Sequence, residues 1–124
     1  MSDDRIALGK RGEALAADCL RRSGFRILGR NVRFPAGEID IVARDGKTIC
    51  FVEIKARRSL GFGFPEEAVT FHKQRRLRRL AEWYLLSRRL ADAPVRFDVV
   101  SILLDQNGAP SRTRLIKGAF DAST

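Results

Sequence analysis

Two apolar segments joined by Asp45-Gly46 constrain the fold of this chain more than any other feature, and they span Gly37–Arg57, GEIDIVARDGKTICFVEIKAR. An Asp-Gly pair between runs rich in β-branched residues is a strong signal for a β-hairpin, because its tight turn needs positive φ angles. With Asp45 and Gly46 as the two-residue loop, Arg44 faces Lys47 across the hairpin. This register decides which side chains share a face.

Three charged residues lie in these segments, where a core strand would carry none. In the predicted register Asp40 lies opposite Phe51, and successive side chains of a strand point to opposite faces. The same face of the hairpin therefore carries Asp40, Glu53 and Lys55. Asp40 and Glu53 become diagonal neighbours, with Cα atoms about 7–8 Å apart.

Burying two acids and a lysine among isoleucine, valine and phenylalanine costs free energy unless the charges have partners. Mg²⁺ or Mn²⁺ would be a suitable partner, because such ions bind carboxylate oxygens and keep waters for a reaction. Asp40 and Glu53 are candidate metal ligands, and Lys55 is a candidate for orienting or deprotonating a nucleophile or neutralising a transition state. The alternative is an ion pair between Lys55 and one of the acids on a solvated face.

A helix is predicted from about Asp4 to Ser23, because apolar and small residues recur there at spacings of three and four. Glu13 lies about 60° around this helix from Ala16, at the margin of the apolar stripe. A carboxylate there reaches the hairpin if the helix packs across it. The alternative is a solvated glutamate paired with a nearby arginine or lysine.

The other segments complete an α/β order of helix, three strands, helix and strand, which predicts one domain over residues 1–124 with a mixed central sheet flanked by helices. They are a strand over Phe25–Phe34 bulged near Gly29, a helix capped by Thr70 and ending near Arg89, a buried strand over Val95–Leu104, an edge strand over residues 113–116 and a frayed tail over residues 118–124. Asp98, within the buried strand, is a candidate for supporting the site or for capping a neighbouring backbone, and is left outside the catalytic set.

The second helix begins with a basic run, in which five of seven residues from Lys73 to Arg79 are cations. The whole chain carries 24 Lys and Arg against 15 Asp and Glu, for a net charge of +9. Such an excess suits a polyanion, and phosphates bind well near the N-terminus of a helix. The candidate nucleic-acid-binding residues are Lys73, Gln74, Arg75, Arg76 and Arg79. The alternative is a basic face that is merely solvated.

Several classes of protein are disfavoured by composition. Two cysteines and one histidine are too few for an ordinary zinc site. The N-terminal sequence lacks the pattern of a signal peptide, and no apolar run has the length of a membrane span. The expectation is a cytoplasmic protein without a membrane partner.

An acid, a short hairpin and the motif E-x-K together resemble the PD-(D/E)-x-K nuclease superfamily. More narrowly, the chain resembles the YraN-like family of small predicted endonucleases through G-E-x-x-A, G-E-I-D-I-V-A, F-V-E-I-K-A-R, P-E-E-A-V and R-F-D-V-V, from about Gly12 to Val100. The resemblance implies a restriction-endonuclease-like core, Asp40 and Glu53 as metal ligands and Lys55 as the catalytic lysine. Similarity to archaeal Holliday junction resolvases adds a helical glutamate, which falls on Glu13, to the catalytic and metal-binding set. Ile39 stands where the superfamily motif has proline.

These observations favour a metal-dependent endonuclease that cuts DNA, selecting its substrate by structure rather than by sequence. A branched substrate with two-fold symmetry would require a homodimer. The alternatives are a nucleic-acid-binding module with a nuclease-like fold and no cleavage, and a structural adaptor whose charge serves solubility.

Overall fold

The computed structural model describes residues 2–58 and 64–121, with side chains described from residue 7 onward. Its elements are, in chain order, α1 (Ser2–Arg22), β1 (Arg26–Phe34), β2 (Gly37–Asp45), β3 (Thr48–Arg57), the short 3-10 helix η1 (Pro65–Ala68), α2 (Phe71–Ser87), β4 (Val95–Leu104) and β5 (Pro110–Phe120). The α/β order predicted from the sequence is confirmed.

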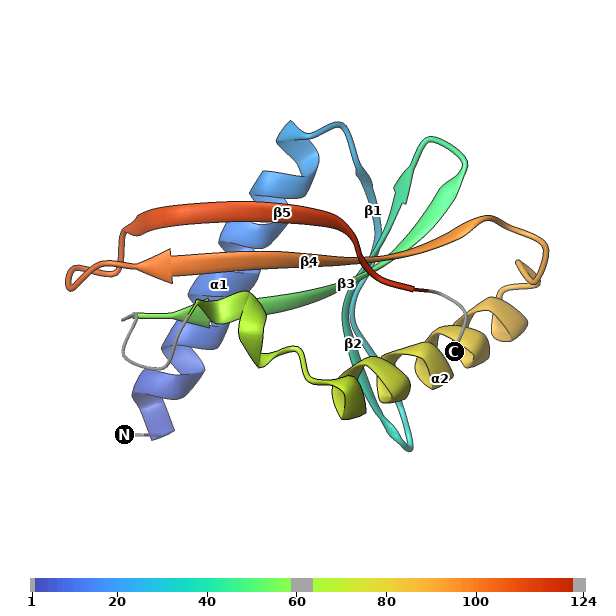
Figure 1. Ribbon diagram of the computed structural model, residues 1–124, viewed down its shortest axis with the longest axis horizontal. Helices are drawn as coiled ribbons and strands as arrows, with labels where there is room; N and C mark the ends of the chain where they lie inside the picture. The colour runs from blue at the N-terminus through green and yellow to red at the C-terminus, as the bar shows by residue number, and fades with distance from the viewer. Residues whose placement is uncertain (1, 59–63, 122–124) are drawn as a thin grey trace.

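The five strands form one mixed sheet in the spatial order β1-β2-β3-β4-β5. Neighbouring strands are antiparallel except β3 and β4, which run parallel and are connected through η1 and α2. The helices α1 and α2 cover opposite faces of the sheet (Figure 1). This arrangement is consistent with the restriction-endonuclease-like core that the sequence resemblance implies.

Each helix packs its own apolar core against one face of the sheet, so the central strand β3 contributes buried residues to both cores. On the α1 side the buried residues include Ala16, Ala17, Leu20, Ile41, Ala43, Cys50 and Val52. On the α2 side they include Leu77, Leu80, Tyr84, Ile39, Val42, Phe51 and Phe97. The strand that carries E-x-K is therefore held firmly between two layers.

Local signals in the sequence set most element ends. The side-chain oxygen of Thr70 accepts a hydrogen bond from the backbone N–H of Lys73 at 3.4 Å, so the predicted N-cap of α2 is confirmed. The predicted bulge in β1 also occurs, between Ile27 and Gly29. No helix in the described part of the chain is long and apolar enough to cross a membrane.

The edge strand β5 is longer than predicted, and it includes residues 118–120, which the sequence assigned to a frayed tail. The reason is tertiary packing: Phe120 pairs with Phe97 in the β4–β5 ladder, and their rings stack with centroids 5.1 Å apart. Residues 122–124 lie outside the described part of the chain.

The helix α1 packs very close to β3 at Gly12. A Cβ atom added at Gly12 would lie 2.9 Å from the Cβ of Ala56, which is closer than such atoms approach in proteins. A Cβ added at Gly9, one turn earlier, would meet no atom within 4 Å. Only glycine at position 12 allows this close approach, which also brings the adjacent Glu13 towards the hairpin.

Gly12→Ala is therefore expected to lower the free energy of unfolding by about 1–3 kcal/mol, because overpacking outweighs the better helix propensity of alanine. Gly9→Ala is the matched control and is expected to raise it by up to about 1 kcal/mol. Urea denaturation of both variants measures the difference. Equal effects at the two positions would contradict a close contact between α1 and β3.

Candidate active site

The turn between β2 and β3 corrects the predicted register. The structure pairs Asp45 with Thr48 and Arg44 with Ile49, so the loop is Gly46-Lys47 rather than Asp45-Gly46. Gly46 has a positive φ of 63°, whereas Asp45 and Lys47 do not have positive φ angles. Glycine thus occupies the first central position, as in a type II′ turn, and the predicted loop, in which both Asp45 and Gly46 would have positive φ angles, is wrong.

This correction moves every partner by two residues, which preserves the face of each side chain because the pleat has a period of two. Phe51 pairs with Val42 instead of Asp40. The observed ladder ends at the pair Ile41–Val52, before Asp40 and Glu53. The two acids are nevertheless neighbours, because the charge of Glu53 acts on Asp40, although the turn was predicted incorrectly.

The strands β2 and β3 separate at Asp40. Their ladder ends at the pair Ile41–Val52, and beyond it the two strands diverge (Figure 1). Ile39 packs on the α2 side with Val42, although Ile41 packs on the α1 side, so the alternation of faces is interrupted next to Asp40. The Asp40 carboxylate accepts a hydrogen bond from the backbone N–H of Ile54 at 2.9 Å. It occupies the fork between the strands.

The environment of Asp40 disfavours its negative charge. Burial, followed by the negative charge of Glu53, raises the pKa of the Asp40 carboxyl to about 7. The hydrogen bond from Ile54 and the positive charge of Lys55 oppose this increase but do not cancel it. A partly buried acid beside a second acid is an arrangement that a cation would stabilise.

Two lysines from different elements lie beside this pair of acids. Lys55 Nζ is 3.3 Å from Glu53 Oε1, so the ion pair considered from the sequence does form. Lys73, in the first turn of α2, lies next to Lys55, whose hydrogen bond and positive charge lower the pKa of the Lys73 ammonium. The site thus combines two carboxylates and two ammonium groups.

Glu13 projects from α1 into a pocket of about 400 Å³ that Asp40 and Lys55 also line. Its carboxylate is already engaged, because Oε1 accepts a hydrogen bond from Asn31 Nδ2 at 2.6 Å and lies 3.3 Å from Arg30 Nη2. The predicted proximity of Glu13 to the hairpin is therefore observed. Its partners, however, are residues of β1 rather than the other acids.

Asn31 is a site residue that the sequence reasoning missed. It lines the same pocket as Glu13 and Asp40, and its backbone is left-handed with a φ of 52°. The β1–β2 pairs on either side, Arg30 with Ile41 and Val32 with Ile39, place Asn31 level with Asp40. Asparagine tolerates positive φ better than most residues, and strained backbone often accompanies a functional site. The sequence did contain a signal for this residue, namely an asparagine within a segment predicted to be a strand.

The basic residues of α2 lie along one helix that begins at the site. Arg75, Arg76 and Arg79 line a hollow of about 260 Å³ next to β2, with Arg76 beside Gly37. Among the described residues, none of these three arginines forms an ion pair with a carboxylate. Gln74 differs, because its amide donates to the carbonyl of Val69 and lies near Glu66 and Phe120.

Comparisons with known proteins identify the family of this chain. A family model described as "Uncharacterised protein family UPF0102" matches residues 12–102. The chain belongs to the UPF0102 family. This is the YraN family that the sequence motifs resemble. A UPF0102 protein of Moorella thermoacetica is 51% identical over 120 residues, covering 97% of this chain and 100% of the relative. One from Syntrophotalea carbinolica is 46% identical over 121 residues, covering 98% and 97%.

The matched segment of this UPF0102 protein contains every candidate site residue, from Glu13 to Arg79. It also contains Asp98, which is fully buried and is bound by Arg96 at 2.8 Å and by the backbone N–H of Gly118 at 2.9 Å. Asp98 therefore holds β4 to β5, as the capping alternative anticipated.

The acids of this UPF0102 protein fit a metal ion only in part. Among the described residues, no three His, Cys, Asp or Glu side chains are gathered closely enough to hold a metal. The set of Glu13, Asp40 and Glu53 is therefore not assembled, since Glu13 is held by Asn31 and Arg30. Asp40 and Glu53 alone do fit Mg²⁺ or Mn²⁺, because two carboxylates with completing waters satisfy such ions.

Proposed function

We propose that this UPF0102 protein is a metal-dependent endonuclease that hydrolyses phosphodiester bonds of DNA. The observation that carries the proposal is the Asp40 carboxyl, whose pKa is raised to about 7 by burial and by Glu53. Perturbed acids in an open pocket are characteristic of functional sites, and a plain surface ion pair would not bury one of them. The lysines beside the acids suit a phosphate.

In this function Asp40 and Glu53 would hold Mg²⁺ or Mn²⁺ through their carboxylate oxygens. When bound, such an ion supplies a water of lowered pKa and positive charge near the phosphate. Lys55 is oriented by Glu53 and would stabilise negative charge that develops on the phosphate oxygens. Lys73 would bind the same phosphate group, since a shared anion relieves the repulsion between the two lysines.

The basic surface of α2 would hold the DNA backbone next to this site. Arg75, Arg76 and Arg79 lie within two turns of Lys73 and form no ion pair with a carboxylate of the described residues, and the chain carries a net charge of +9. Contacts to phosphates carry no sequence information by themselves, which favours selection by DNA structure. A junction with two-fold symmetry would require two copies of the chain.

A second candidate function is binding of nucleic acid without cleavage. It is favoured by one observation, namely that Glu13 does not join Asp40 and Glu53 in a three-carboxylate set. The basic surface of α2 would serve this function equally well. Dependence on a divalent metal separates the two candidates.

The test is a titration of Mg²⁺ or Mn²⁺ against labelled linear, flapped and four-way DNA. We expect cleavage that requires metal, stops with EDTA and is fastest on one of the branched substrates. Salt-sensitive binding to all three substrates without cleavage at any metal concentration would support the binding module instead. The products are measured by denaturing electrophoresis.

A further inference from the structure

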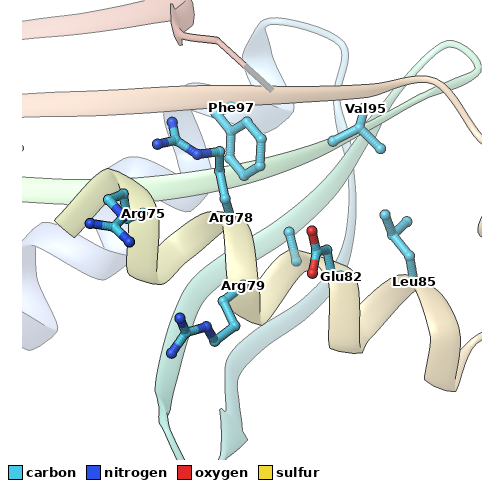
Figure 2. Close-up of a pocket in the computed structure, with 8 residues that line it drawn as sticks. Arg75, Arg78, Arg79, Glu82, Leu85, Val95 and Phe97 are labelled. Atoms are coloured by element: carbon cyan, nitrogen blue, oxygen red, sulfur yellow. The ribbon is translucent and has the colours of Figure 1, made fainter. Parts of the chain in front are cut away.

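A second pocket, with a volume of about 370 Å³, lies between α2 and β4 and adjoins the β2 hollow, with which it shares Arg75 and Arg79 (Figure 2). One wall is basic and contains Arg75, Arg78 and Arg79. The floor is apolar and is formed by Val95 and Phe97 of β4. Neither the fork at Asp40 nor the hollow next to β2 shares this floor.

Of the three arginines of this pocket, Arg78 alone does not line the β2 hollow, and its side chain rises from α2 towards β4 beside Phe97 (Figure 2). Its Nη1 donates to the carbonyl of Asp121 at 3.3 Å, and its guanidinium lies 5.9 Å from the ring centre of Phe71. These contacts hold the side chain in place without neutralising it, since no carboxylate of the described residues forms an ion pair with Arg78. A fixed, uncompensated guanidinium is well suited to bind a phosphate.

The pocket has two chemically different ends. Arg75 and Arg78 lie towards the start of α2, whereas Glu82 and Leu85 lie further along the helix, next to Val95 (Figure 2). A phosphate is repelled from the Glu82 end and attracted to the arginine end. The Glu82 end offers an apolar surface and a carboxylate that accepts hydrogen bonds from N–H or O–H groups.

Size and shape decide between forms of nucleic acid. The volume is near the lower end of the roughly 300–1,000 Å³ found for small-molecule sites, so one nucleotide fits and a double helix does not. The bases of a duplex are also paired and stacked inside it, where an apolar floor cannot reach them. An unpaired base can lie on such a surface while its phosphate binds arginine.

We propose that the pocket between α2 and β4 binds one nucleotide of a single-stranded segment of nucleic acid. The phosphate binds at Arg75 and Arg78, and the base lies over Val95 towards Glu82. The proposal rests on the proposed function in that it defines the substrate class, a DNA with an unpaired segment beside the site. The pocket itself requires neither metal nor cleavage.

The test measures binding in EDTA, so that no cleavage occurs, by fluorescence anisotropy of a short labelled strand and of the same strand annealed to its complement. Arg78→Gln is expected to weaken binding of the single strand about fivefold and to reduce its log–log salt slope by about 0.7. Binding of the duplex should change by less than about twofold. Thermal melts check that loss of the bond to Asp121 leaves the fold intact.

Arg76→Gln is the matched control, because it removes the same charge from the same helix on the β2 side. It should weaken binding of the single strand and the duplex by similar factors. If Arg78→Gln behaves like Arg76→Gln, the arginines form one continuous surface and the pocket is not a separate site.

Polyphosphate and poly-glutamate, used as competing polyanions without bases, complete the test. If Arg78→Gln weakens either of them as strongly as it weakens the single strand, the pocket binds anions in general and the nucleotide assignment is wrong. A selective loss of single-strand binding in a protein that never cleaves DNA would reject the nuclease and retain the pocket. Metal-dependent cleavage by a protein in which Arg78→Gln does not change single-strand binding would support the nuclease and reject the nucleotide pocket.

Discussion

Lys55→Ala is expected to lower the rate of Mg²⁺-dependent DNA cleavage at least about a thousandfold, because the variant loses the positive charge proposed to stabilise the reacting phosphate. Asp40→Asn and Glu53→Gln should have effects at least as large, since each would remove one of the two proposed metal ligands. None of the three side chains belongs to the apolar cores against α1 and α2. The losses should therefore appear in kcat/KM without unfolding.

Lys47→Ala is the control for these variants. Lys47 is an exposed lysine in the turn of the same hairpin, away from the fork at Asp40. This variant should cleave DNA within about twofold of the unmodified protein, since an exposed lysine far from the site contributes little. Wild-type cleavage by Glu53→Gln would show that the site is misassigned, even if the protein is a nuclease.

Asp40→Asn is expected to stabilise the metal-free protein at neutral and alkaline pH. The folded protein raises the pKa of Asp40 from 3.8 to about 7, so it binds the proton more tightly than the unfolded chain does. The stability that comes from the protonated form is complete below about pH 4 and is lost as the pH rises through about 7. This loss corresponds to at most about 4 kcal/mol.

Part of this loss comes from repulsion between the carboxylates of Asp40 and Glu53, so it belongs to the pair and not to Asp40 alone. We therefore expect the free energy of unfolding of Asp40→Asn to exceed that of the unmodified protein by roughly 1–3 kcal/mol. Melts in EDTA at about pH 8 should then show Asp40→Asn several degrees above the unmodified protein. At about pH 5 the difference should be much smaller. Excess Mg²⁺ should raise the melting temperature of the unmodified protein and affect the variant little.

Asp45→Asn provides a control of opposite sign on the same strand. The Asp45 carboxylate accepts a hydrogen bond from Arg96 at 2.9 Å, which lowers its pKa. Such a group stabilises the fold above its unfolded pKa and loses that contribution as the pH falls through its folded pKa. Asp45→Asn should therefore melt lower than the unmodified protein at about pH 8, with or without Mg²⁺.

If Mg²⁺ raises the melting temperatures of Asp40→Asn and the unmodified protein equally, Asp40 is not a metal ligand.

Local patterns in the sequence were sufficient for the order of the elements and for several of their ends. The helical stripe before Ser23, the cap at Thr70 and the apolar run of β4 each depend on residues close together in the chain. The grouping of Asp40, Glu53 and Lys55 was also accessible, even though the turn was placed one residue too early. When a predicted pairing partner is wrong by two residues, each side chain in the ladder still points to the predicted face of the sheet.

Tertiary structure decided how these groups interact. Asp40 lies partly buried beside Glu53 where the β2–β3 ladder ends, and no local pattern encodes this environment. Lys73 reaches Lys55 because α2 is anchored across the sheet, and Asn31 holds Glu13 because α1 packs closely at Gly12. These contacts join segments far apart in the chain. The sequence by itself determined which chemical groups are present and on which elements they lie, whereas their distances and ionisation depended on packing between elements, because burial and charge pairing act through space.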